Sequence, residues 1–104
     1  MRSLEFVAML TPEDRYRHFH RRVGKRVVEF RVQYETKLGG EWYPVVRYDT
    51  AHGFAHRDLI DRHGRQRKAP IFARSLNEAL IFAEYDIKSN WRMYKRDFLR
   101  GENP

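Results

Sequence analysis

One short segment of the sequence, residues 49–58, gathers side chains that could transfer protons. Within these positions the chain places two histidines and two aspartates around a glycine: Asp49, His52, Gly53, His56 and Asp58. A histidine titrates near neutral pH, and a carboxylate beside it fixes its tautomer and raises its basicity. Residues of these types at this spacing could act as general acid and general base in the cleavage of a phosphodiester.

Each of these residues can be given a role in metal-independent cleavage of RNA, in which the ribose 2′-hydroxyl attacks its own phosphate. We expect His56 to be an acid or base oriented by Asp58, because side chains two apart on a strand share a face. His52 would be the second acid or base, and the glycine lets the chain fold back so that His52 or Asp49 approaches the pair. Two neighbouring arginines would stabilise the anionic transition state: Arg47 and Arg57.

The same residues allow two other interpretations. Asp49 could cap a turn, as Asx residues commonly do, and His56 could pair with Asp58 for structure alone. A metal site could use His52 and His56 with either aspartate, but Gly53 and the strand-like residues after it argue against the helix that suits a His-x-x-x-His pair. The chain has no cysteine, which argues against a closed structural zinc site. We therefore predict no metal and no cofactor.

The chain as a whole is strongly basic. It has 21 Lys+Arg against 14 Asp+Glu, a formal net charge of +7, and most of the cations are arginines, whose planar fork fits phosphate. Such a charge favours an anionic partner, nucleic acid first, although some cations could simply form a solvated face balanced by nearby acids. The candidates for nucleic-acid contact are Arg21, Arg22, Arg47, Arg62, Arg65, Arg67, Lys68, Lys88, Arg92 and Arg96.

The elements that must position these side chains follow from the spacing of the apolar residues. Residues 28–35 alternate between apolar and polar, which is typical of a strand with one wet face. Residues 42–49 predict the return strand, and residues 55–60 predict a third. A capping box at residues 75–78 precedes a long apolar stripe with helical spacing, which predicts a C-terminal helix of about 24 residues.

These elements predict one domain over residues 1–104 of the α+β class. We expect a three- to four-stranded antiparallel sheet with one long C-terminal helix packed across one face. Residues 12–24 fit a helix or a strand and stay open. No apolar run reaches the length of a membrane span, and the lack of cysteine fits a reducing compartment, so we expect a cytoplasmic protein with no membrane partner.

Two resemblances to known proteins bear on the function. Residues 45–53, Val-Val-Arg-Tyr-Asp-Thr-Ala-His-Gly, resemble a run found in uncharacterised small prokaryotic domains, which implies no particular activity. The Tyr-Asp-x-x-x-Gly pattern that starts at Tyr48, followed by His56 and Arg57, resembles TumE-type toxins of prokaryotic toxin–antitoxin pairs, although the chain departs from that pattern around residues 56–58. This second resemblance implies an antitoxin partner and an activity aimed at nucleic acid.

The observations lead to one expected function and one alternative. We expect a small basic protein that engages nucleic acid, RNA first, as a toxin-type metal-independent ribonuclease. Its partner would be an acidic antitoxin or another acidic protein. The alternative is a non-catalytic module that binds nucleic acid or protein as an adaptor or assembly subunit.

Overall fold

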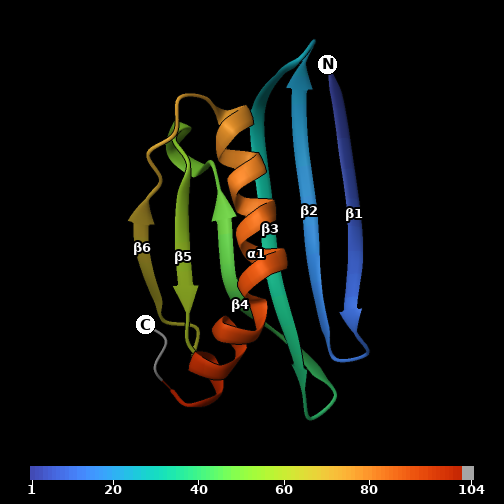
Figure 1. Cartoon of the computed structure of the whole chain (residues 1–104), viewed down its shortest axis with the longest axis vertical. Coiled ribbons are helices and arrows are strands. Elements are labelled where there is room, and N and C mark those ends of the chain that lie inside the picture. Colours follow the sequence, from blue (N-terminus) through green and yellow to red (C-terminus); the bar gives the residue numbers. More distant parts are fainter. Residues whose placement is uncertain (102–104) are drawn as a thin grey trace.

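Six antiparallel strands and one long helix make up the described part of the computed structural model, which covers residues 1–101 apart from the side chain of His52. The strands are β1 (Arg2–Thr11), β2 (Asp14–Val23), β3 (Arg26–Leu38), β4 (Glu41–Asp49), β5 (His56–Ile60) and β6 (Gln66–Pro70). A short 3-10 turn, η1 (Ala51–Gly53), follows β4, and the helix is α1 (Leu76–Leu99). Each strand pairs with its neighbour in the chain, and α1 lies across one face of the sheet over β3 and β4 (Figure 1).

The α+β class agrees with the sequence, but the expected three- to four-stranded sheet is wrong, because the sheet has six strands in the described residues. The open question over residues 12–24 is answered by β2, whose side chains alternate between the two faces of the sheet. At the edges, β1 pairs with β2 without interruption from Arg2 to Met9. The other edge strand, β6, is charged and solvent-exposed, as sheet edges often are. Its residues therefore lack the apolar alternation that predicts a strand.

The predicted C-terminal helix is present. Its N-cap is Ser75, whose hydroxyl oxygen accepts the Glu78 N–H at 3.1 Å. The Glu78 carboxylate does not complete the capping box by reaching back to Ser75 and instead accepts the N–H of Arg74. Gly101 follows the helix with φ +74°, a left-handed conformation that glycine adopts without strain.

The two faces of the sheet differ in what covers them. On the helix side, strand residues such as Val32 and Tyr34 pack under α1 residues such as Ile87 and Trp91 to form the core. On the opposite side, which we call the open face, no element covers the described strands (Figure 1). By strand register, the open face carries Arg15, Arg17, Arg21, Glu29, Arg31, Gln33, Glu35, Arg47, Asp49, His56, Asp58 and Lys68.

Among the described residues, no helix combines the length and the apolar character that crossing a bilayer requires.

Candidate functional site

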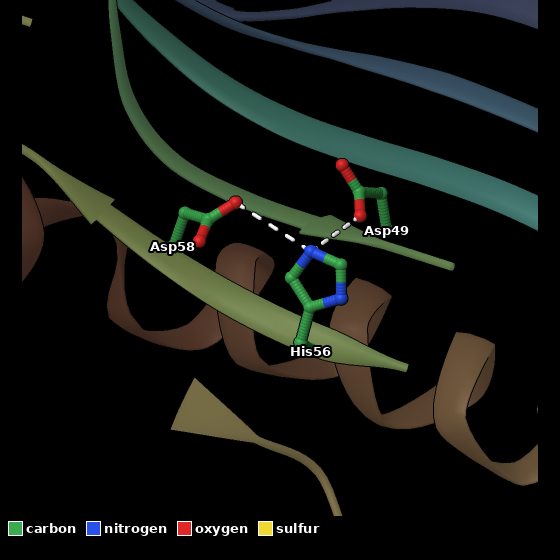
Figure 2. Close-up of side chains that lie close together, drawn as sticks. All are labelled: Asp49, His56 and Asp58. Atoms are coloured by element: carbon green, nitrogen blue, oxygen red, sulfur yellow. Dashed lines mark ion pairs between the residues drawn. The ribbon is translucent and has the colours of Figure 1, made fainter. Parts of the chain in front are cut away.

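The structure brings Asp49, His56 and Asp58 together on the open face. Asp49 ends β4 and lies directly opposite His56 at the start of β5, and Asp58 follows two residues later on the same face. The imidazole Nε2 of His56 lies 2.7 Å from Asp49 Oδ1 and 3.7 Å from Asp58 Oδ2 (Figure 2). All three side chains are buried. We call these three residues the His56 cluster.

Two cations balance the charge of the His56 cluster. Lys68 on β6 lies opposite Asp58, and its Nζ is 2.9 Å from His56 Nε2 and 3.5 Å from Asp58 Oδ1. Arg31 on β3 places Nη2 at 3.7 Å from Asp49 Oδ2. Two carboxylates thus face two cations, which lets these charges persist away from water.

The contacts of His56 define two alternative proton positions. A proton on Nε2 can be donated to Asp49 at 2.7 Å, whereas an unprotonated Nε2 can accept a hydrogen bond from Lys68 at 2.9 Å. In the second state the proton sits on Nδ1, which lies 3.4 Å from the Phe54 carbonyl oxygen. The cluster can therefore store a proton at either ring nitrogen.

Access limits what this cluster can do. The exposed fraction of His56 is 1% and that of Asp58 is 2%, whereas the Lys68 side chain is about half exposed. A substrate would reach His56 Nε2 only after Lys68 moves away. Asp49 also accepts the N–H of Ala51 at 3.1 Å, so it caps the turn after β4, as one of the alternative interpretations requires.

The His56 cluster also has the composition of a metal site. One ligand atom from each of its three residues lies within 4.8 Å of the others. Imidazole and carboxylate donors suit zinc or a similar divalent ion. The Asp58 Oδ1 atom is buried and makes no hydrogen bond to any described residue, but the Lys68 ammonium lies 3.5 Å from it and already supplies positive charge where a metal ion would bind.

Arg57 lies apart from the His56 cluster. Residues next to each other on a strand point to opposite faces, and Arg57, which lies opposite Tyr48, is on the helix side. Its Nη1 is 3.4 Å from the Tyr94 hydroxyl, and the hydroxyls of Tyr48 and Tyr94 both donate to the Asp86 carboxylate. Burial and the bond to Asp86 raise the pKa of both tyrosines. Arg57 and His56 therefore lie on opposite faces of the sheet and cannot contact the same phosphate.

The other predicted acid or base, His52, has a side chain that lies outside the described residues.

A second group of titratable side chains lies on the helix side, where the sequence patterns indicate no site. His18 Nδ1 bonds the Glu84 carboxylate of α1, and His18 Nε2 lies 2.6 Å from His20 Nδ1. Burial, followed by the charges of His18 and Arg22, lowers the pKa of His20. Burial raises the pKa of Glu84, but bonds from His18 and Lys88 outweigh it and lower that pKa. The alternation of His18 and His20 within a strand is the signal that would have found this group.

The ten candidate cations for nucleic-acid contact divide into paired and unpaired side chains. Five form ion pairs with carboxylates: Arg21, Arg65, Lys68, Lys88 and Arg96. Arg47 donates to the Gln33 amide oxygen at 2.6 Å. Within the described residues, neither Arg47 nor the remaining four have a carboxylate at ion-pair distance; those four are Arg22, Arg62, Arg67 and Arg92. A cation without an internal partner can neutralise a phosphate without first breaking an ion pair.

One end of the sheet concentrates such cations. The β2–β3 hairpin and the start of β1 carry four of them, which we call the basic tip: Arg2, Arg22, Lys25 and Arg26. The register places Arg2 opposite Arg22 and Arg26 opposite Val23, and none of the four meets a carboxylate among residues 1–101. Asn77 of α1 fixes this hairpin, because its side chain accepts the Val27 N–H at 2.9 Å and donates to the Lys25 carbonyl at 2.8 Å.

The comparisons with known proteins find an uncharacterised domain, but they do not test the particular run at residues 45–53. The model of one family, described as a domain of unknown function (DUF7718), matches residues 1–104. No curated protein and no solved structure matches the chain. The resemblance to TumE-type toxins is untested by these comparisons and stays a prediction.

Proposed function

We propose that this chain, which belongs to the DUF7718 family, binds nucleic acid in the cytoplasm and contacts the phosphates of RNA through the basic tip. The observation that carries the proposal is the absence of any carboxylate partner for Arg2, Arg22, Lys25 and Arg26 among the described residues. Elsewhere in the fold, cations such as Arg15 and Lys95 are bound to acids at 2.6 and 3.1 Å. Charge that is not neutralised within the fold is available to a partner.

The physics of phosphate binding favours this location. Each phosphate that a cation neutralises releases condensed counterions, so several cations close together bind a nucleic-acid backbone with a steep dependence on salt. The start of α1 lies at the same end of the molecule as the hairpin (Figure 1), and its dipole adds partial positive charge there. RNA loops and single strands are the first candidates because they offer both phosphates and unpaired bases. An acidic antitoxin or another acidic protein would be attracted to the same tip.

A binding assay with matched variants tests this proposal. We expect the triple variant Arg22→Gln, Lys25→Gln, Arg26→Gln to lose about tenfold or more in affinity for a single-stranded RNA, with the salt slope reduced by about two. The control is Arg17→Gln, Arg31→Gln, Arg74→Gln, which removes the same charge from cations that already have carboxylate partners. Equal losses in the two variants would show that only net charge matters and would overturn the proposal.

A second candidate function is a toxin-type metal-independent ribonuclease, and the convergence of the His56 cluster favours it. In this proposal, Lys68 leaves His56 Nε2 to bind the phosphate, and the freed Nε2 takes the proton of the attacking 2′-hydroxyl. The 2′-oxygen bonds to phosphorus to form a 2′,3′-cyclic phosphate as the bond from phosphorus to the 5′-oxygen breaks. The departing 5′-oxygen takes a proton from water, and the protonated His56 returns its proton to the solvent. Asp49 also has to turn away from Nε2, which it contacts at 2.7 Å, and the Phe54 carbonyl oxygen, 3.4 Å from Nδ1, then orients the ring. Arg57 has no role in this site, because it lies on the other face of the sheet.

An RNA cleavage assay in EDTA tests the second candidate. We expect the wild-type chain to shorten a structured RNA on a denaturing gel, and His56→Ala to leave it intact. His63→Ala, a change at an exposed turn residue, is the control, and Lys68→Ala provides a second variant that leaves the buried ring in place. Cleavage that survives His56→Ala would rule this function out, and intact RNA with shifted mobility would leave the binding function alone.

A further inference from the structure

A pocket on the helix side of the sheet takes no part in the functions proposed so far. It has a volume of about 410 Å³ and lies between the first half of α1, strands β4 to β6, and residues 71–73, which belong to the connection from β6 to the helix. Its walls include Tyr48, Arg57, Ile71, Phe72 and Phe82. This volume falls within the range of small-molecule sites, which are mostly apolar with a few polar groups that fix the ligand.

Arg57 is the cation in this pocket, and one of its donors has no acceptor. Its Nε is buried and makes no hydrogen bond within the described residues, whereas its guanidinium interacts with the hydroxyls of Tyr48 and Tyr94, the latter at 3.4 Å from Nη1. No described carboxylate lies at ion-pair distance from it. A buried donor without an acceptor is destabilising, so a ligand that brings oxygen atoms to the guanidinium would be favoured. The planar fork suits a phosphate or a carboxylate in particular.

Two phenylalanines of the pocket wall lack the burial that such rings usually have. Phe72 is 93% exposed and Phe82 is 48% exposed. The Phe82 ring meets the buried Tyr48 edge to face, with centroids 6.1 Å apart, which holds it in place beside the pocket. Exposed aromatic rings grouped around a hollow are typical of a site that stacks a flat ligand.

The remaining charge at the rim does not compete for Arg57. Glu78 also lines the pocket, but its carboxylate is bound to Arg74, with Arg74 Nε at 3.0 Å from Glu78 Oε2. The pocket thus combines apolar aromatic walls with a guanidinium that has no carboxylate partner among the described residues.

We propose that this pocket binds a nucleotide, with the phosphate on Arg57 and the base against Phe72 and Phe82. The shared chemistry is a terminal phosphate joined to an aromatic base, and it could come from a free mononucleotide or from the phosphorylated end of an RNA strand. The second source rests on the proposed binding of RNA, whereas the first does not. The pocket and the basic tip are formed by different residues, so each can be removed without the other.

Titration calorimetry with adenosine monophosphate and uridine monophosphate tests the proposal, with the two nucleosides as controls. We expect the monophosphates to bind and the nucleosides to bind about tenfold more weakly or not at all. Arg57→Met should weaken the monophosphates by about tenfold or more, while Arg100→Met, the same change at an exposed arginine beyond the far end of α1, should leave them unchanged. Phe72→Ala keeps the fold intact because the ring is almost fully exposed, and it should weaken monophosphates and nucleosides alike.

The outcomes separate this inference from the proposed function. The triple variant of the basic tip should bind monophosphates as the wild type does, and Arg57→Met should retain the salt-dependent binding of long RNA. If a short RNA with a 5′-phosphate binds more tightly than its 5′-hydroxyl form and more tightly than the monophosphate, the ligand is an RNA end. If the monophosphate binds as well as the RNA, the ligand is a free nucleotide. Absence of monophosphate binding to the wild type, or an equal loss in Arg100→Met, would overturn the proposal.

Discussion

The open face of the sheet and the basic tip carry the same types of charged residue but use them differently. On the open face, the Glu35 carboxylate forms ion pairs with Arg15 at 2.6 Å and with Arg17 at 3.2 Å. The Asp49 carboxylate likewise lies within ion-pair distance of His56 and Arg31. At the tip, the cations lie next to one another and meet no acid in the described residues. The open face therefore stabilises the fold, and the tip is left for a partner. Cations that are dense in a sequence need not be available on the surface, because pairing across strands decides which of them are free.

The largest change in stability is expected when an acid is removed from the open face. We expect Asp49→Ala to lower the free energy of unfolding by about 3 kcal/mol, because it leaves a buried imidazole and a backbone N–H without their acceptor. Urea unfolding followed by circular dichroism measures the change. Glu29→Ala, which breaks a half-exposed pair with Arg21 on the same face, should cost less than about 1 kcal/mol. Equal effects would mean that burial does not distinguish the two pairs.

A second, smaller effect on stability is expected for a paired acid that lies outside the open face. Asp14 is buried at the start of β2. Burial raises the pKa of Asp14, but hydrogen bonds from four side chains outweigh this effect and lower the pKa below its ordinary value of 3.8. The four donors are Thr11, Tyr34, Lys95 and Thr36. A lowered pKa in the folded state adds stability above the unfolded value, and this stability is lost as the pH falls through 3.8 toward the folded value.

We therefore expect Asp14→Asn to cost about 2 kcal/mol at pH 7, with the difference from the wild type shrinking below about pH 4. Urea unfolding at pH 7 and at pH 3 checks this. Asp97→Asn, which changes an acid paired with Arg96 nearer the surface, is the control and should show little difference at either pH. A deficit for Asp14→Asn that is as large at pH 3 as at pH 7 would contradict the expectation.

The smallest effect is expected at the basic tip. Arg26→Gln should change the free energy of unfolding by less than about 0.5 kcal/mol, and any change should be toward greater stability because neighbouring cations repel one another. Arg15→Gln is the contrasting variant, since that guanidinium pairs with Glu35 and lies 3.9 Å above the Trp42 ring. Thermal unfolding should separate the two variants. If both lower the melting temperature alike, the tip cations have structural partners after all and the comparison fails.

The sequence predicts some elements of this fold well and others poorly, for physical reasons. The helix is predictable because its cap and its apolar stripe are both local signals. In β1, apolar side chains such as Phe6 and Val7 occur on both faces of an edge, so the strand shows no contrast between a wet and a dry side. In β6, all side chains but one are exposed, so no apolar pattern exists to indicate it.

The candidate site, too, is partly predictable from local spacing and partly dependent on how the strands pair. His56 and Asp58 can be placed together from their spacing, because alternation along one strand is a local property. That alternation also sets Arg57 on the other face, so its separation from His56 could have been predicted from the sequence. The contact between Lys68 and His56 depends on the register of β5 and β6, and the opposition of Arg2 and Arg22 depends on β1. Neither register can be known before those edge strands are recognised.

The strands pair in the order in which they occur along the chain, so folding can proceed in two stages: the sheet forms first and the helix packs on it afterwards. Every pairing in the sheet joins neighbours along the chain, so hairpins can close over short loops and form early. The helix that covers Val32, Tyr34 and Val46 is encoded after all six strands. During synthesis, these side chains stay in contact with water until α1 has left the ribosome, and the growing chain is most prone to aggregation just before that moment.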